Sequence, residues 1–145
     1  MNFNLFKRNG RNGKHSRDAL KKILLVDDEA TFVKLTKMSL EQLGPFEVHT
    51  ETRAREAISA ALRFKPDFIL LDVMMPDGDG GQVAAQMQEY EELKDIPVVF
   101  VTAAVKKDET GNRARRIGGR TYLAKPIRAE ELVECIEAMS EVSAA

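Results

Sequence analysis

Three short runs of apolar residues, each ended by a polar side chain, constrain the fold of this chain most strongly. They span residues 23–26, 68–71 and 98–101. The runs are continuous rather than alternating, which is typical of parallel strands buried on both faces of a sheet. Longer amphipathic stretches separate them, as in repeated strand–helix units. The sequence therefore predicts an α/β fold built around a parallel sheet.

Two weaker and more polar runs, at residues 46–49 and 121–124, suit edge strands and bring the number of strands to five. Apolar residues at helical spacing predict five helices, near residues 32–43, 54–62, 83–87, 105–117 and 132–139. Thr52 is placed to cap the second helix. Gly111 weakens the fourth by about 1 kcal/mol. Right-handed crossovers then give a doubly wound sheet with helices on both faces.

Length and charge point to one domain with a basic tail. The 145 residues suffice for one core, and 22 Lys plus Arg against 23 Asp plus Glu give a net charge of −1, which favours neither nucleic acid nor membrane as a partner. We predict a flexible basic tail at residues 1–20, a domain at 21–141 and a short tail at 142–145. No apolar run is long enough to cross a bilayer, so we expect a cytoplasmic protein. Cys135, the only cysteine, is expected to pack in the core.

Polar residues follow four of the five predicted strands. They are Asp27, Asp28 and Glu29 after the first run, Asp72 after the second, Thr102 after the third, and Lys125 with Pro126 after the last. Because the carboxyl ends of parallel strands lie at one edge of an open sheet, where ligands bind in such folds, we expect these side chains to meet. Glu29 is expected to begin a helix, and Asp77 and Asp79 to be turn and cap residues.

The residue types at this edge suit phosphoryl chemistry. Three carboxylates in one crevice repel each other unless a cation compensates them, and Mg²⁺ prefers such oxygen ligands together with phosphate oxygens. A carboxylate can also accept a phosphoryl group whose charge is spread over cations and donors. Lys125 offers a positive charge, and Thr102 offers a hydroxyl donor.

From about residue 21 to about residue 139 the chain resembles the receiver domain of two-component response regulators, of the single-domain, chemotaxis-regulator-like kind. The matching segments are ILLVDDE at 23–29, LLDVMMP at 70–76, VTA at 101–103 and YLAKP at 122–126, in the family's order and at its spacing. The resemblance implies a flavodoxin-like fold with strand order 2-1-3-4-5. The loop at 76–81 and the Gly118-Gly119-Arg120 stretch depart from the family pattern without touching the chemical residues.

The resemblance also implies a role for each site residue. Asp72 would accept the phosphoryl group, and Mg²⁺, or Mn²⁺, would be held by Asp27, Asp28, Asp72 and the backbone carbonyl of Met74. Thr102 and Lys125 would bind the phosphoryl oxygens, with a cis bond before Pro126 aiming the lysine. Tyr122 matches the aromatic residue that turns inward when Thr102 moves.

The implied function is that of a stand-alone phosphoacceptor and not of an enzyme acting on other substrates. The donor would be a sensor histidine kinase or a histidine phosphotransfer protein. Phosphorylation would change the surface of the fourth helix, fifth strand and fifth helix and so control binding of an unidentified protein, with no direct DNA binding and no membrane insertion. Basic residues gather on the expected output face, at Lys106, Lys107, Arg113, Arg115, Arg116 and Arg120, which favours an acidic partner.

Two other functions have to be weighed. A pseudo-receiver would keep the fold as a docking module without regulated phosphorylation, but such modules usually lack an acid, the Thr or the Lys, and all are present here. A Mg²⁺-dependent phosphatase would have its nucleophile at the first strand and a second acid two positions on. Asp27 is instead followed directly by Asp28, and Ala30 stands two positions after Asp28. The pattern does not match.

Overall fold

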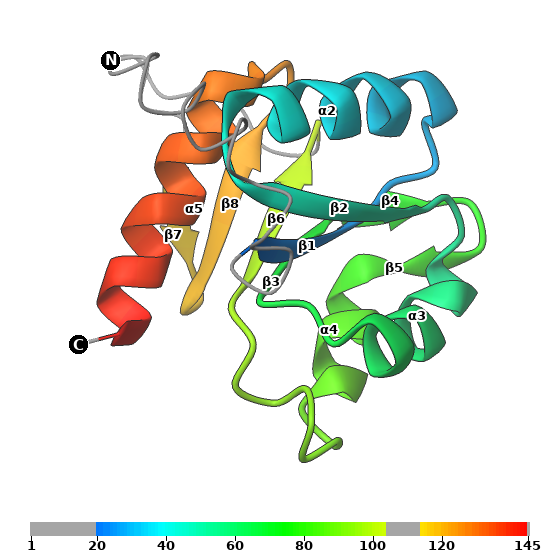
Figure 1. Ribbon diagram of the computed structural model, residues 1–145. Coiled ribbons are helices and arrows are strands. Elements are labelled where there is room, and N and C mark those ends of the chain that lie inside the picture. Colours follow the sequence, from blue (N-terminus) through cyan, green and yellow to red (C-terminus); the bar gives the residue numbers. More distant parts are fainter. Residues whose placement is uncertain (1–19, 104–113, 145) are drawn as a thin grey trace.

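Figure 1 shows the computed structural model, which describes residues 20–103 and 114–144. The elements in chain order are β1 (Lys21–Val26), α2 (Ala30–Leu43), β2 (Phe46–Glu51), the 3-10 helix η3 (Ala54–Glu56), α3 (Ala57–Phe64), β3 (Phe68–Leu71), β4 (Met74–Met75), β5 (Gly78–Asp79), α4 (Gly80–Met87), β6 (Val98–Thr102), β7 (Ala114–Ile117), β8 (Arg120–Ala124) and α5 (Ala129–Ala144). Strands and helices thus alternate along most of the chain.

The main sheet has the order β2-β1-β3-β6-β8-β7. Its first five strands pair in parallel, and they correspond in sequence to the five predicted strands. The predicted flavodoxin-like order 2-1-3-4-5 is therefore confirmed. The sixth strand, β7, pairs antiparallel with β8 and extends the sheet at that edge. A separate two-stranded ribbon, β4 with β5, follows β3.

The central strands are continuously apolar because the sheet buries both faces. Within β1, for example, Ile23 and Leu25 join one core cluster, whereas Leu24 and Val26 join the other. Helices α2 and α5 cover the first face, and α3 and α4 cover the second (Figure 1). Successive side chains of a central strand therefore point alternately into the two hydrophobic cores, as the period of two along a strand requires.

Helix starts depend on acidic caps more than the sequence predicts. Asp79 is the N-cap of α4 and accepts a hydrogen bond from the Gly81 N–H at 2.7 Å, which confirms its predicted role. Asp77 accepts hydrogen bonds from the backbone N–H groups of Ala54 (2.9 Å) and Arg55 (3.1 Å) at the start of η3. The prediction that Thr52 caps this segment is wrong, because Arg53 is the N-cap residue and no side chain of its own caps the helix. A carboxylate from a distant loop supplies the acceptor instead.

The predicted helix over residues 105–117 requires a correction. Residues 104–113 lie outside the described residues, but Ala114–Ile117 forms strand β7 and not the end of a helix. Gly118 (φ +59°) and Gly119 (φ +80°) join β7 to β8. Two consecutive residues with positive φ make the turn whose twist matches a β-hairpin, and glycine adopts them without strain. The Gly-Gly pair therefore outweighs the helical spacing before it.

The described residues contain four α-helices, one fewer than the five predicted. At the C-terminus α5 runs to Ala144, so the helix continues into the segment 142–145 that was predicted to be a tail. Residues 1–19 of the predicted basic tail lie outside the described residues. No helix in the described ranges has the length and apolar character needed to span a membrane.

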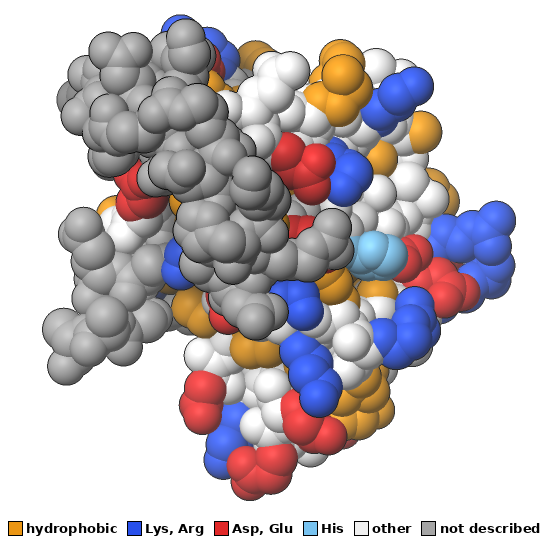
Figure 2. Space-filling model, viewed as in Figure 1, with side chains coloured by type: hydrophobic (Ala, Val, Ile, Leu, Met, Phe, Trp, Pro, Cys, Tyr) orange, Lys and Arg blue, Asp and Glu red, His pale blue; other side chains and the backbone are white. Residues whose placement is uncertain are grey.

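Two smaller predictions concern the core and the surface. Cys135 packs beside the core between the sheet, α2 and α5, as expected, and burial raises the pKa of its thiol to about 11. On the face shown in Figure 2, acidic and basic side chains are interspersed over the described surface and form no large patch of one sign.

Candidate functional site

Backbone hydrogen bonds of the sheet continue one residue beyond the ends of three strands and so hold predicted polar residues at the carboxyl edge. The N–H of Asp27 donates to Glu51 O (3.0 Å), that of Asp72 to Val26 O (3.0 Å), and that of Lys125 to Thr102 O (3.0 Å). These backbone bonds hold the residues that directly follow β1, β3 and β8. Side chains that are far apart in the sequence consequently share one edge of the sheet.

Three carboxylates meet there. Asp27, Asp28 and Asp72 each place an oxygen so that all three atoms lie within 4.8 Å of one another. Asp27 is 0% exposed and Asp72 is 6% exposed, whereas Asp28 is half-buried. Burial raises the pKa of Asp27, and the nearby Asp72 adds to this effect, although the Lys125 ammonium and the Glu29 N–H act in the opposite direction. The cluster therefore carries a cost in repulsion and lost hydration that a cation would offset.

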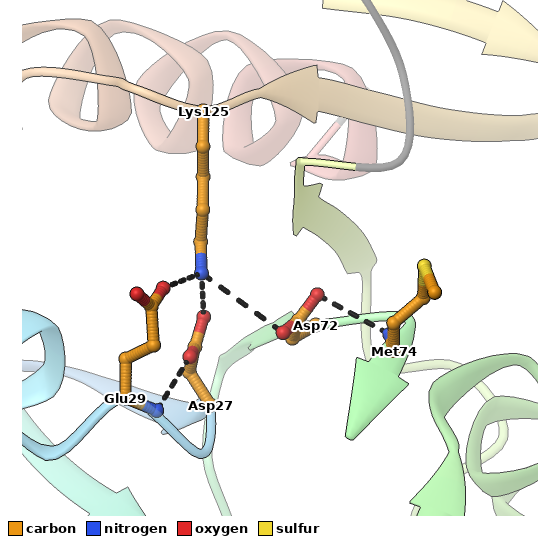
Figure 3. Close-up of polar contacts among 5 residues, drawn as sticks. All are labelled: Asp27, Glu29, Asp72, Met74 and Lys125. Atoms are coloured by element: carbon orange, nitrogen blue, oxygen red, sulfur yellow. Dashed lines mark hydrogen bonds and ion pairs between the residues drawn. The ribbon is translucent and has the colours of Figure 1, made fainter. Parts of the chain in front are cut away.

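In the described part of the chain, Lys125 is the positive group that pairs with these acids. Its Nζ lies 2.6 Å from Oδ2 of Asp27, 2.6 Å from Oε1 of Glu29 and 3.9 Å from Oδ2 of Asp72 (Figure 3). It also lies 4.5 Å from the centre of the Phe32 ring. Burial alone would lower the pKa of Lys125, but the close ion pairs with Asp27 and Glu29 outweigh burial, so the pKa is raised. Lys125 therefore remains charged inside the site.

Asp72 is positioned by the loop that follows it. Its Oδ1 accepts a hydrogen bond from the N–H of Met74 at 3.3 Å. The Met74 side chain is exposed and points away, so this residue offers the site its backbone (Figure 3). Gly80 lies against Asp72 from the other side: a Cβ at Gly80 would stand 2.0 Å from the Asp72 carbonyl oxygen. Only glycine lets α4 begin this close to the acidic residue.

Thr102 and Tyr122 occupy neighbouring strands. Thr102 ends β6, is 1% exposed and pairs in register with Ala124, directly before Lys125. Tyr122 is half-buried, and its ring stacks on Phe100 with centroids 4.9 Å apart. Phe100 precedes Thr102 by two residues and so lies on the same face of β6. The Lys125–Pro126 bond is cis.

The carboxylates fit a divalent cation such as Mg²⁺. Asp27 Oδ2 is buried and, among the described residues, accepts no hydrogen bond of good geometry, although Lys125 Nζ lies 2.6 Å away. One carboxylate oxygen from each of Asp27, Asp28 and Asp72 lies within 4.8 Å of the other two at the edge of the sheet. Such an all-oxygen donor set is the kind that Mg²⁺ or Mn²⁺ accepts.

Sequence reasoning missed two contacts of Lys125, with the Glu29 carboxylate and with the Phe32 ring. Glu29 is the N-cap residue of α2, as expected for a residue that begins the helix, but its side chain makes no cap bond and instead accepts from Lys125. Phe32 supplies the ring beneath the ammonium. The run of three acids at 27–29 was a visible signal for Glu29. The position of Phe32 one turn into α2 carried no signal of its own.

Comparison with known proteins yields one consistent family. The model of the response regulator receiver domain matches residues 23–137. The polar-differentiation response regulator DivK of Brucella ovis is 35% identical over 118 residues, which cover 81% of this chain and 94% of DivK. The DivK protein of Brucella anthropi is 34% identical over the same length.

Solved structures agree with this similarity. The chemotaxis protein CheY4 of Vibrio cholerae is 25% identical with a TM-score of 0.69, covering 82% of this chain and 98% of CheY4. The N-terminal domain of a response regulator receiver protein from Methanoculleus marisnigri is 30% identical with a TM-score of 0.62, covering 82% of this chain and 95% of that one. Both likenesses extend over most of the chain.

Proposed function

Because this chain belongs to the response regulator receiver domain family, we propose that it is a signalling switch turned on by phosphorylation of Asp72. One observation carries the proposal: Asp72 lies with Asp27 and Asp28 in a carboxylate cluster at the carboxyl edge of the sheet, and the Lys125 ammonium is 3.9 Å from it. An acceptor, a cation site and a fixed positive charge are thus side by side. We assign this activity to the domain at residues 21–141.

The metal would be held by the side chains of Asp27, Asp28 and Asp72 and by the backbone carbonyl of Met74. When bound, Mg²⁺ supplies positive charge that offsets the repulsion between these carboxylates and the oxygens of an incoming phosphoryl group. Met74 also holds Asp72 in place, since its N–H donates to Oδ1. This hydrogen bond orients the carboxylate before a donor arrives.

In the proposed transfer, a carboxylate oxygen of Asp72 forms a bond to phosphorus. The bond from phosphorus to the donor's histidine nitrogen breaks, and its electron pair leaves with the imidazole. Lys125 would bind one oxygen of the transferred group, and Thr102 would donate its hydroxyl to another. The donor would be a sensor histidine kinase or a histidine phosphotransfer protein.

The response would pass along β6 and β8. Movement of Thr102 toward the phosphoryl group would change the packing of Tyr122, which stacks on Phe100 two residues earlier in β6. The surface that responds then includes β8, the adjoining β7 and α5, with Arg115, Arg116 and Arg120 exposed on it. This surface would bind a downstream protein.

The test is phosphorylation by a small-molecule phosphodonor, read as the added mass of one phosphoryl group on the intact protein. We expect wild type to be modified only when Mg²⁺ or Mn²⁺ is present, and Asp72→Asn not to be modified at all. Asp28→Ala should lose the dependence on metal together with most of the reaction. Asp95→Asn, which changes an exposed aspartate outside the site, is the matched control and should behave as wild type.

Two results would contradict the proposal. Modification of Asp72→Asn to the wild-type extent would show that another residue accepts the group. A wild-type chain that is never modified, under conditions in which it is folded and Mg²⁺ is present, would favour the pseudo-receiver alternative, a docking module without regulated phosphorylation.

A further inference from the structure

Lys125 is shared among three carboxylates, and the two that it contacts are not the proposed acceptor. Its Nζ is 2.6 Å from both Asp27 and Glu29 but 3.9 Å from Asp72. Figure 3 shows the ammonium between the Glu29 and Asp27 side chains, with Asp72 to one side. In this arrangement Lys125 Nζ lies 1.3 Å further from Asp72 (3.9 Å) than from Asp27 or Glu29 (2.6 Å each).

The two partners differ in how readily they can release the lysine. Asp27 is 0% exposed and needs a nearby cation to compensate its buried charge. The Glu29 side chain is 61% exposed, so water can replace the lysine there at small cost. A divalent cation bound by Asp27, Asp28 and Asp72 would compensate Asp27, and it would repel the ammonium. Glu29 is then the partner that still holds Lys125 away from Asp72.

We propose that Glu29 is a positioning residue that holds Lys125 in the unphosphorylated state and releases it when a phosphoryl group on Asp72 offers a stronger acceptor. The proposal rests on the function proposed above. It concerns regulation of the same site, because the ion pair between Lys125 and Glu29 has to break before Lys125 can bind the phosphoryl group. The stronger this ion pair is, the more of the attraction between the phosphoryl group and Lys125 is used to break it. A weaker contact favours the phosphorylated arrangement.

The predicted size of the effect follows from the exposure of Glu29. An ion pair with one exposed partner has a small free energy, and this free energy is lost when Lys125 leaves Glu29 to bind a phosphoryl analogue. Removing the pair should therefore tighten binding of the analogue by about two- to fivefold. Loss of a negative charge near the site would also favour an anion, by a general field effect. Glu29→Asp separates the two explanations, since it keeps the charge but shortens the side chain by about 1.5 Å, one carbon–carbon bond.

The experiment is a titration of beryllofluoride, an analogue of the phosphoryl group, at saturating Mg²⁺. Binding is followed through the amide NMR signal of Met74, whose N–H donates to Asp72. We expect Glu29→Gln and Glu29→Asp both to bind the analogue about two- to fivefold more tightly than wild type. Glu89→Gln, which removes one exposed negative charge at the end of α4 away from the site, should bind as wild type.

A second readout follows Lys125 itself. The ¹⁵Nζ signal of Lys125 should differ between wild type and both Glu29 variants in the free proteins, and should converge to one position in all three when beryllofluoride is bound. A purely structural role for Glu29 would not produce this convergence.

The outcomes separate the two proposals. If Glu29→Asp binds as wild type while Glu29→Gln binds more tightly, the general field explains the effect and the positioning role is wrong; equal binding by all three proteins also overturns it. If wild type shows no Mg²⁺-dependent binding that Asp72→Asn abolishes, it is the phosphoacceptor function that fails.

Discussion

Two edges of the same sheet are built on different physical principles. At the carboxyl edge, Asp27, Asp72 and Thr102 are all at most 6% exposed, and their environment is set by side chains packed from several strands. At the lateral edge, every described residue from Arg115 to Arg120 is exposed, and the local structure is set by the backbone of the turn at Gly118 and Gly119. The positions of the residues at the carboxyl edge depend on tertiary packing, whereas those at the lateral edge depend on the local backbone conformation.

Glycine makes this difference measurable, because each edge depends on a glycine for a different reason. Gly80 has an ordinary backbone conformation but no room for a side chain, since Asp72 lies against it. Gly118 has open space around it, and its φ of +59° is the constraint. Replacing Gly80 by alanine therefore tests the requirement for space alone, and replacing Gly118 by alanine tests the requirement for a positive φ alone.

The largest effect is expected at the carboxyl edge. In Gly80→Ala the new Cβ would stand 2.0 Å from the backbone oxygen of Asp72, and 3.0 Å from the Cα of Val73, so backbone rather than a flexible side chain has to move. We expect a loss of about 3 kcal/mol in the free energy of unfolding, at the upper end of the usual cost of overpacking. Urea denaturation followed by circular dichroism would measure it.

Gly81→Ala is the matched control for this change. Its Cβ would meet the side chains of Arg120 and Asp79 at 3.2 Å, and both can shift. Since alanine is also preferred over glycine in a helix, the net change should be less than about 1 kcal/mol. Equal losses for the two variants would mean that the close approach of α4 to Asp72 does not decide the stability of this edge.

The carboxyl edge could be predicted from the sequence because each of its residues is marked locally. Asp27, Asp72 and Thr102 each follow a continuous apolar run, and parallel strands bring such ends together whatever the details of packing. The order of the five parallel strands was also correct, but it came from the resemblance to receiver domains and not from these local signals. The local signals do not predict how far apart the side chains lie. Nothing in the sequence indicates that Lys125 contacts Glu29 and Asp27 more closely than Asp72.

The lateral edge could not be predicted in the same way. Residues 114–117 have no strong period of their own, so their structure follows from the Gly118-Gly119 turn and from pairing with β8. The cap of η3 was predicted wrongly for a different reason. Thr52 is the local candidate, but Asp77, more than twenty residues further along, has the side chain that reaches the free N–H groups. The β7 error came from preferring the helical spacing to the Gly118-Gly119 turn, and the cap error came from preferring a local candidate to a tertiary contact.

A smaller effect is expected at the lateral edge. Gly118→Ala should cost about 1 kcal/mol, because alanine has to adopt a left-handed conformation there. Asparagine tolerates that conformation better, so Gly118→Asn should cost less. Amide hydrogen exchange would locate the loss: protection should fall in β7, whereas the N–H of Lys125, bonded to Thr102 O, should keep its protection. A fall in protection at both places would mean that the two edges are not independent.

The smallest effect concerns Asp77, an exposed residue that links the loop after the site to the start of η3. The N–H groups of Ala54 and Arg55 hold the pKa of Asp77 below its ordinary value of 3.8. A carboxyl group whose pKa is lower in the folded than in the unfolded state stabilises the fold above the unfolded pKa, and this contribution is lost as the pH falls through the folded pKa. Wild type should therefore be slightly more stable than Asp77→Asn at neutral pH, and the difference should vanish once the pH is well below 3.8.

Thermal melts of both proteins across this range measure the difference, with Asp95→Asn as the control that should track wild type throughout. A gap between wild type and Asp77→Asn that stayed constant down to the lowest pH would mean that the amide substitution acts through packing and that the charge of Asp77 does not stabilise the helix start.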